Sequence, residues 1–380
     1  MESKMVPMKI IEMNTHALSI PMSVREVFGK PGVKGRANPV IIRLKTDEGM
    51  EAFGIAYAFD DFQVNSLKAS IDDLKEVVIG QDIFHYARTW KELHVALRHT
   101  GQWGGYGINA ISAIDTAFWI LRAKVAGLPL SRLLGGFKDE VLTYASDVLR
   151  EFNTIDDLQK EAASLVAKGF RAVKMKLGGK KAASLKAQAE RVGAVREVLG
   201  ENISLLLECH WSYTLPEAIR LGHELERYSP YWFEDPVGLH DGAISLEDTD
   251  ALAEITRALS VPVAAGETFS TKYAFRRLIE KRAVDIVIVD LVRCGGITEW
   301  MKIAAMAEAW NLPVASHCFH DFSAHVIAAI PNGLIVEYMP WWDVIYEEPP
   351  QVVDGCFRIS DKPGLGLELN LEAMKKYEIL

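Results

Sequence analysis

The chain has 380 residues, of which 49% are hydrophobic, and a formal net charge of −9, so it is long enough to bury a large core and has the composition of a soluble enzyme. Its charges are spread along the sequence without the basic patches that bind nucleic acid or an anionic membrane, and no apolar stretch approaches the roughly 20 residues of a membrane span. We therefore predict no nucleic-acid partner and no membrane segment. We also expect a cytoplasmic location, because no signal-like apolar run follows Met1.

The first 130 residues mix strands and helices. Strands are predicted at Lys9–Leu18, Val40–Thr46 and Glu51–Tyr57, the last two joined by a turn at Asp47–Met50. Helical periodicity then predicts helices at Leu67–Val78, Tyr86–His99 and Ile111–Ala126. Residues 1–130 are therefore interpreted as a separate α+β domain.

From about Pro129 onward, short runs rich in valine, isoleucine and leucine alternate with segments of helical period, which is typical of βα units around a parallel sheet. The predicted strands are Val141–Leu149, Ala172–Leu177, Ile203–Glu208, Tyr231–Glu234, Pro262–Gly266, Asp285–Asp290, Pro313–Ser316 and Leu334–Tyr338. The predicted helices are Ile155–Ala167, Ser184–Leu199, Leu215–Arg227, Leu246–Ala258, Tyr273–Glu280, Thr298–Ala309 and Ser323–Ala329. The pattern predicts a closed α/β barrel over residues 131–350. Residues 351–380 are too short to fold alone and are expected to pack back on the N-terminal domain.

Ionisable residues gather at the ends of the predicted barrel strands, where the active sites of such barrels lie. In chain order they are Lys174, Lys176, Glu208, His210, Glu234, Glu267, Asp290, His317 and Glu337. Because strand residues alternate between faces, both lysines can point into one pocket while Met175 points away.

The three glutamates on consecutive strands, Glu208, Glu234 and Glu267, would repel one another in a barrel mouth unless a cation bound them. Hard oxygen ligands in this number favour Mg²⁺, with water and substrate oxygens completing the shell. A divalent ion that chelates a substrate carboxylate stabilises the enediolate formed when the α-carbon loses its proton.

The remaining polar residues suit proton transfer. A lysine beside a second lysine and a cation gives up its proton more readily, so Lys176 is the candidate base and Lys174 its helper. His317 is a second base or a general acid, with Asp290 as the partner that orients it. Glu337 could stabilise charge from the side.

Together these motifs resemble the enolase superfamily, specifically its mandelate racemase subgroup. The resemblance is carried by Lys174-Met175-Lys176, Glu208, Phe233-Glu234-Asp235-Pro236, Gly266-Glu267-Thr268, Val289-Asp290, Ser316-His317 and Val336-Glu337-Tyr338, and by residues 109–115 and 133–136, which look like the capping region of that family. It implies a modified TIM barrel of the form (β/α)7β under an N-terminal α+β cap, one Mg²⁺ on three acidic strand ends, a lysine base and a histidine–aspartate pair. Members often form homo-oligomers, which we also expect here.

Three features depart from that subgroup or stay open. Glu208 stands where aspartate is common, and His210 stands where asparagine is common, so His210 could contact substrate, act as an acid or bind the metal. Asp290-Leu291-Val292-Arg293 offers no lysine where the muconate cycloisomerase-like group has its strand-six base, which disfavours dipeptide epimerisation and cycloisomerisation. The family also implies a mobile loop over the barrel mouth, for which Pro21–Arg36, with its basic residues, and Trp103 are candidates.

A base on each face of a substrate allows dehydration or inversion. We predict a small-molecule sugar acid as substrate and a hydro-lyase that dehydrates it to a 2-keto-3-deoxy acid. The alternatives are a racemase or epimerase of a 2-hydroxy acid and a catalytically silent barrel that only binds acids.

Overall fold

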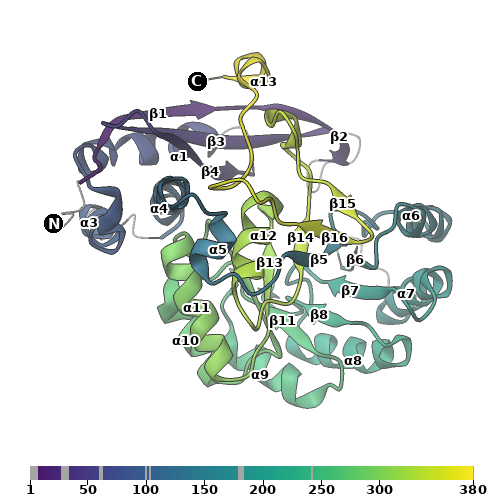
Figure 1. Cartoon of the computed structure of the whole chain (residues 1–380). Coiled ribbons are helices and arrows are strands. Elements are labelled where there is room, and N and C mark those ends of the chain that lie inside the picture. The colour runs from purple at the N-terminus through teal and green to yellow at the C-terminus, as the bar shows by residue number, and fades with distance from the viewer. Residues whose placement is uncertain are drawn as a thin grey trace.

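The computed structural model describes residues 7–26, 34–59, 63–98, 101, 104–178, 184–240 and 243–379. A twisted antiparallel sheet with helices beneath it forms a cap, which lies across one end of a curled sheet surrounded by helices (Figure 1). The α/β class and the capped barrel predicted from the sequence are confirmed. No helix within the described ranges is long and apolar enough to cross a membrane.

The cap sheet is built around one long strand. Its strands are β1 (Ile10–Ala17), β2 (Ile20–Glu26), β3 (Lys34–Thr46) and β4 (Glu51–Ala58). Strand β3 pairs antiparallel with β1 and β2 along one edge and with β4 along the other. The predicted loop Pro21–Arg36 is therefore wrong at both ends, because β2 continues along β3. Backbone hydrogen bonds between strands form with almost any side chain. This glycine-rich and basic stretch can therefore pair as strands although its sequence lacks the alternation of apolar and polar residues that predicts them.

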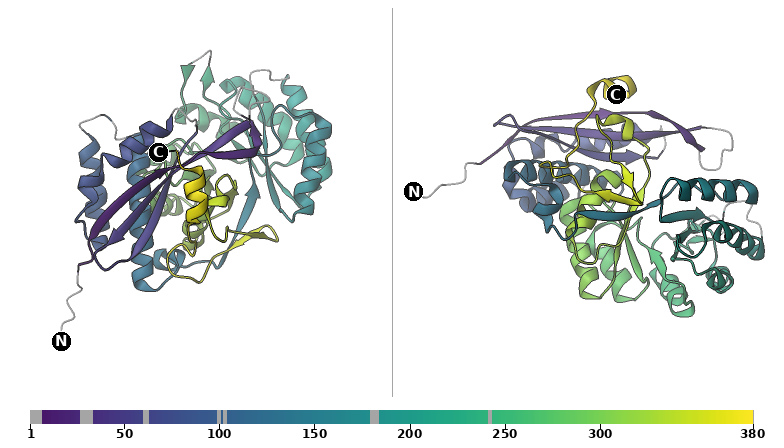
Figure 2. Two further views of the ribbon diagram at one scale, coloured as in Figure 1. Left: turned by 90° about the horizontal axis from the view of Figure 1, so that it is seen from above. Right: turned by 45° about the vertical axis from the view of Figure 1, so that its right-hand side comes forward.

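The cap helices cover the sheet on the side of the barrel (Figures 1 and 2). They are α1 (Val64–Asp72), α2 (Lys75–Val78), the short η2 (Ile83–His85), α3 (Tyr86–Arg98), α4 (Tyr106–Ala126) and α5 (Leu130–Leu134). Helix α4 is buried nearly all round because it lies between β4 and the barrel. Gly54 of β4 allows this close approach, since a Cβ there would stand 1.9 Å from the carbonyl oxygen of Ala113.

The second sheet closes into a barrel. Its eight parallel strands within the described residues are β5 (Glu140–Ala145), β6 (Ala172–Lys176), β7 (Ser204–Glu208), β8 (Trp232–Glu234), β11 (Val263–Ala265), β12 (Ile286–Asp290), β13 (Val314–His317) and β14 (Val336–Tyr338). Strands β5 to β13 pair in that order, and β14 pairs with β5. Backbone hydrogen bonds from Leu334 N to Val314 O (2.8 Å) and from Ser316 N to Ile335 O (3.2 Å) join the last two strands. All eight predicted barrel strands are thus present, most of them shorter than predicted.

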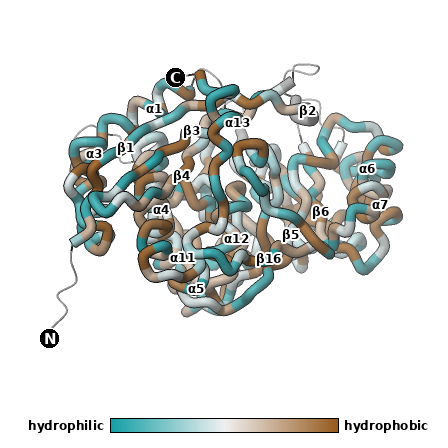
Figure 3. The backbone as a smooth tube through the Cα atoms, turned by 45° about the horizontal axis from the view of Figure 1, so that its top comes forward, coloured by the Kyte–Doolittle hydropathy of each residue, from teal (hydrophilic) through white to brown (hydrophobic). Residues whose placement is uncertain are grey.

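The barrel helices lie outside the strands, and polar and apolar segments alternate along them (Figure 3). They are α6 (Ile155–Ala167), α7 (Leu185–Leu199), α8 (Leu215–Leu225) with η3 (Glu226–Tyr228), α9 (Thr249–Ala258), α10 (Thr271–Glu280), α11 (Ile297–Ala309) and α12 (His320–Ala329). Helix α12 begins three residues before its predicted start. The polar residues His320 and Asp321 resemble a loop in the sequence, but in the structure they are buried and form the first turn of the helix. The sequence did not predict the small hairpin of β9 (Leu239–His240) and β10 (Ala243–Ile244).

The C-terminal segment contacts both parts of the molecule. After η4 (Asp343–Ile345) come β15 (Val352–Val353), β16 (Cys356–Arg358) and α13 (Leu371–Tyr377). Strand β16 pairs antiparallel with β5 of the barrel, whereas Ile379 N donates to Ala17 O of β1 at 2.9 Å. In Figure 2 helix α13 lies against the cap sheet. The division into domains at residues 130 and 350 stays a prediction.

Candidate active site

The inner face of the barrel is apolar below and charged above. Its lower layer is formed by Tyr144, Ala172, Leu206, Trp232, Ala264, Ile286, Ile288, Ala315 and Ile335. Because side chains alternate along a strand, the next inward position toward the carboxyl end of several strands is two residues later, as Lys174 follows Ala172 and Glu208 follows Leu206. The charged residues therefore lie above an apolar layer, and the low effective dielectric constant there strengthens electrostatic interactions among them.

Three of these carboxylates converge. Glu208, Glu234 and Glu267 are all at most 4% exposed, and each offers an oxygen that lies within 4.8 Å of the oxygens of the other two. Burial and the nearby Glu208 raise the pKa of Glu234 well above its ordinary value. Such a set of hard, mutually repelling oxygens fits a divalent cation. The extra methylene of Glu208, compared with aspartate, does not take it out of the cluster.

Lys174 lies inside this acidic cluster. Its Nζ is 3.1 Å from Glu208 Oε2, 3.1 Å from Glu234 Oε1 and 2.7 Å from Glu337 Oε1. Burial opposes its charge, but Glu234 and Glu337 raise the pKa of Lys174 well above its ordinary value. Burial likewise opposes the charge of Glu337, yet Lys174 and His317 lower the pKa of Glu337 to about 2. Lys174 is thus a fixed cation among carboxylates.

Lys176, at the end of β6, lies next to His210. Its Nζ is 3.2 Å from His210 Nε2. His210 has a left-handed backbone (φ 46°), and its N–H donates to Glu208 Oε1 at 3.1 Å. Burial and the Lys176 cation lower the pKa of His210 to about 4, so the imidazole is neutral near pH 7. The lysine and the histidine therefore form one unit on this side of the cluster.

His317 and Asp290 form a pair on the other side. His317 Nδ1 lies 2.6 Å from Asp290 Oδ2, and Asp290 Oδ1 accepts hydrogen bonds from the backbone N–H groups of Val292 (2.8 Å) and Arg293 (2.7 Å). With Nδ1 held, Nε2 is the nitrogen left to face the cluster, 3.1 Å from Glu267 Oε2. Burial opposes protonation, but Cys318 and Glu267 raise the pKa of His317 well above its ordinary value.

Strand order places these two units on either side of the carboxylates. Strand β6 carries Lys176, strands β7, β8 and the end of β11 carry the three glutamates, and β12 and β13 carry Asp290 and His317. The structure therefore brings together all nine site residues predicted from the sequence.

Two further polar residues of the barrel, Arg293 and Ser146, were given no role in the sequence analysis. Arg293 Nη1 donates to Glu267 Oε1 at 3.0 Å, so it holds one of the three carboxylates. Ser146 follows Leu142 and Tyr144 on the inner face, is 5% exposed, and its Oγ has no hydrogen-bond partner among the described residues. Counting inward positions from Tyr144 would have found it in the sequence. Ser146 also lines a cavity of about 840 Å³ between β2, α6 and the end of β14.

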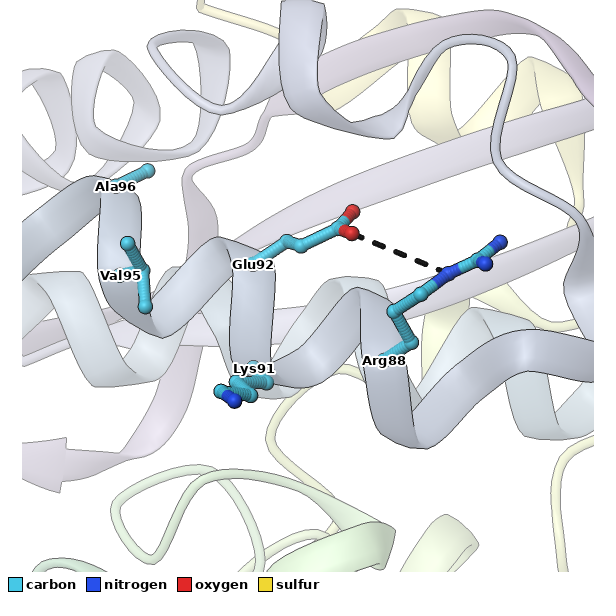
Figure 4. Close-up of a pocket in the computed structure, with 5 residues that line it drawn as sticks. All are labelled: Arg88, Lys91, Glu92, Val95 and Ala96. Carbon is cyan, nitrogen blue, oxygen red and sulfur yellow. Dashed lines mark ion pairs between the residues drawn. The ribbon is translucent and has the colours of Figure 1, made fainter.

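Residues 27–33 of the predicted mobile loop lie outside the described residues, as does Trp103. Arg36 is described, and its side chain bonds to Ser19 of the cap. Its Nη2 donates to Ser19 O at 2.6 Å, so it holds the turn between β1 and β2. A separate hollow of about 390 Å³ lies on α3, where Arg88 and Glu92 pair at 3.9 Å (Figure 4). None of the predicted site residues lines it.

Comparison with known proteins decides the family. Residues 157–374 match the family described as enolase C-terminal domain-like, and residues 24–135 match the mandelate racemase / muconate lactonizing enzyme N-terminal domain. The chain belongs to the mandelate racemase group of the enolase superfamily. The resemblance inferred from the sequence motifs is thereby confirmed.

Relatives in the enolase superfamily carry out more than one reaction. The chain is 32% identical to a D-xylonate dehydratase from Haloferax volcanii, with 91% of this chain and 87% of the relative covered. It is 30% identical to a D-galactarolactone cycloisomerase from Agrobacterium fabrum, with 98% and 99% covered. A solved structure of L-talarate dehydratase from Polaromonas sp. JS666, complexed with Mg and L-glucarate, has a TM-score of 0.88 and 26% identity over 98% of each chain. Dehydratases and cycloisomerases of acid sugars are thus both among the relatives, although the sequence analysis gave cycloisomerisation less weight.

Proposed function

We propose that this protein is a magnesium-dependent acid-sugar dehydratase, which removes the proton α to a carboxylate and releases the C3 hydroxyl as water. One observation carries the proposal: a buried triad of glutamates is flanked on one side by Lys176 with His210 and on the other by His317 with Asp290. Relatives named as dehydratases of sugar acids support the choice of reaction and substrate class.

Glu208, Glu234 and Glu267 would hold the metal. Bound magnesium would supply positive charge beside the substrate carboxylate, which favours loss of the α-proton. Lys174 adds a fixed positive charge at the same place, because three carboxylates keep it protonated. Ser146 Oγ is the hydroxyl available to bind a substrate oxygen from strand β5.

The two flanking units share the proton transfers. Lys176 Nζ takes the C2 proton, and His210 Nε2 then accepts a hydrogen bond from the ammonium. His317 gives the proton on Nε2 to the C3 hydroxyl, the C3–O bond breaks as the C2=C3 bond forms, and water leaves. The enol that remains becomes the 2-keto-3-deoxy acid. Asp290 holds Nδ1 and so fixes which nitrogen of His317 reacts.

The same two-sided arrangement also suits a racemase or epimerase, in which His317 returns a proton to C2 from the opposite face. Cycloisomerisation of an acid-sugar derivative is a further candidate, because two relatives are named as cycloisomerases, one of 3,6-anhydro-α-L-galactonate and one of D-galactarolactone. A silent acid-binding barrel is less well supported, since no predicted ligand or base is missing from the cluster.

Proton NMR in D₂O separates these functions. The purified protein with Mg²⁺ is given a panel of aldonic and aldaric acids, and the C2 proton and any new C3 methylene signals are followed, with EDTA-treated protein as control. We expect loss of the C2 signal together with a 3-deoxy product for at least one acid. Exchange or inversion without elimination would replace dehydratase by racemase or epimerase, and no exchange with any acid would contradict the proposal.

A further inference from the structure

Helix α4 of the cap carries buried polar side chains that contact the barrel. Ser112 Oγ donates to Leu291 O at 2.8 Å, and Asp115 accepts from Thr298 N at 2.8 Å and from Thr298 Oγ1 at 2.5 Å. Trp119 Nε1 donates to the same hydroxyl at 2.9 Å. Residues 112, 115 and 119 share one face of the helix. Buried polar groups cost free energy unless paired, so a polar stripe on this otherwise apolar helix calls for an explanation.

The side-chain hydrogen bonds of Ser112, Asp115 and Trp119 to the barrel fall on a short segment after β12 and on the first turn of α11, which follows it. Residues 291–296 join Asp290, the last residue of β12, to helix α11. On the outer side the segment is bonded to Ser112, and Trp90 Nε1 of α3 donates to Gly295 O at 2.8 Å. Asp115 contacts the first turn of α11, where the backbone N–H groups have no partner within the helix.

The inner side of this segment orients the acid–base pair. Its backbone N–H groups at Val292 and Arg293 hold Oδ1 of Asp290, whose Oδ2 holds His317 Nδ1. Arg293 also reaches Glu267 of the carboxylate cluster. A displacement of the segment would therefore move the carboxylate that orients His317, because two backbone N–H groups of the segment hold it, whereas the long side chain of Arg293 can adjust and keep its contact with Glu267.

The fit between cap and segment is close. Gly296 has a φ of +89°, and a Cβ there would stand 2.7 Å from Asp115 Oδ2. Only glycine combines this backbone conformation with room for the Asp115 carboxylate. The segment is thus clamped between the cap on one side and Asp290 on the other, with little freedom to shift independently of α4.

We propose that Ser112 and Asp115 are positioning residues for the Asp290–His317 pair, through which the cap sets the orientation of His317. The inference rests on the proposed function, because it needs His317 to exchange a substrate proton. It assigns a role to the sequence motif at residues 109–115, which contributes no residue to the metal cluster or to its two flanking units. No comparable contact of α4 with β6 is found in the described part of the chain, so the effect should be confined to the histidine side.

The test uses the two C2 epimers of a 3-deoxy sugar acid, which cannot lose a C3 hydroxyl and so report only proton exchange. Deuterium incorporation at C2 is measured by NMR for the wild type and for a Ser112→Ala/Asp115→Asn variant. Lys176→Ala and His317→Asn assign each epimer to its base. Thr116→Val is the matched control, since it removes a buried hydroxyl of α4 that, within the described ranges, bonds only to Ser112 O of its own helix. Thermal unfolding is followed for every variant.

We expect the double variant to lose exchange of the His317 epimer by about tenfold to a hundredfold, as a small displacement of a reacting group does, and to keep exchange of the Lys176 epimer within about twofold. Thr116→Val should leave both rates unchanged. Equal losses for both epimers, or unchanged rates, would overturn the inference even if the proposed function stands. Absence of exchange of either epimer by the wild type would instead overturn the proposed function and this inference with it.

Discussion

The two sides of the proposed active site are built differently. The histidine side is braced: His317 is 7% exposed, its partner Asp290 is held by two backbone N–H groups, and the segment that carries them is clamped by the cap. The lysine side is more open, because Lys176 is the last residue of β6, is partly exposed and is contacted by the neutral imidazole of His210. On the histidine side Nε2 of His317 is thus held in one orientation, whereas on the other side Lys176 keeps the freedom to approach the substrate.

The largest expected effect on activity comes from changing the glutamate cluster, because both sides depend on the metal that it would bind. Glu234→Gln keeps the shape of a side chain that accepts from Trp232 Nε1 and contacts Lys174, but it removes a charge from the middle of the triad. We expect Mg²⁺ affinity measured by calorimetry to fall by more than about a hundredfold and exchange to be lost on both sides. Unchanged affinity would show that the metal does not bind at this cluster.

The next effect should be confined to the lysine side. His210→Asn removes the ring that lies 3.2 Å from Lys176 Nζ. We expect exchange of the epimer assigned to Lys176 to slow by about tenfold to a hundredfold while the epimer assigned to His317 is unaffected. Equal slowing of both epimers, measured by the same NMR assay, would place His210 with the metal instead of with the lysine.

Ser146 should matter for binding and not for either proton transfer. Its buried hydroxyl has no partner among the described residues, so a substrate oxygen can bind it in the ground state and the transition state alike. Ser146→Ala should therefore raise KM by about threefold to tenfold, the range for one hydrogen bond, with kcat unchanged. A drop in kcat at constant KM in steady-state kinetics would contradict this assignment.

The smallest effect on catalysis is expected at a buried histidine away from both sides. His325 Nδ1 accepts from Ser131 N at 3.3 Å and its Nε2 donates to Leu365 O at 3.1 Å, an arrangement that requires the neutral ring. Burial lowers its pKa from 6.5 to about 4, the opposite direction to His317, which has acidic neighbours.

Because the unfolded chain binds this proton first, the stability that His325 contributes is present above pH 6.5 and is lost as the pH falls toward 4. The loss approaches about 3 kcal/mol. Chemical denaturation of His325→Gln and the wild type between pH 4 and 7 should show a shallower pH dependence in the variant. Parallel curves would mean that His325 does not titrate in this range.

The sequence revealed the site because its residues follow the ends of recognisable strands. Glu208, Glu234 and His317 each end a valine- or leucine-rich or aromatic run, and parallel strands bring such ends together without any knowledge of loops. Glu267 lies two residues past β11 and was found in the same way.

The residues that the sequence did not assign act through contacts between distant segments. Ser112 and Leu291 are 179 positions apart, and Arg36 contacts Ser19 across a hairpin that had been predicted as a loop. Hydrophobic periodicity predicts which face of a helix or strand is buried, but not which other element it packs against. The contacts by which α4 holds the segment after Asp290 could therefore be found only in the structure. Likewise the sequence gives Lys174 only as the helper of Lys176, and its role as a fixed cation depends on three carboxylates from other strands.

The most direct test of a two-sided site is C2 deuterium exchange, with both epimers of a 3-deoxy sugar acid, by the wild type, Lys176→Ala and His317→Asn in the presence of Mg²⁺. Two bases on opposite sides of the metal ligands predict that the wild type exchanges both epimers and that each variant loses a different one. If both variants exchanged both epimers at the wild-type rate, neither Lys176 nor His317 could be the base, and the proposed mechanism would be wrong.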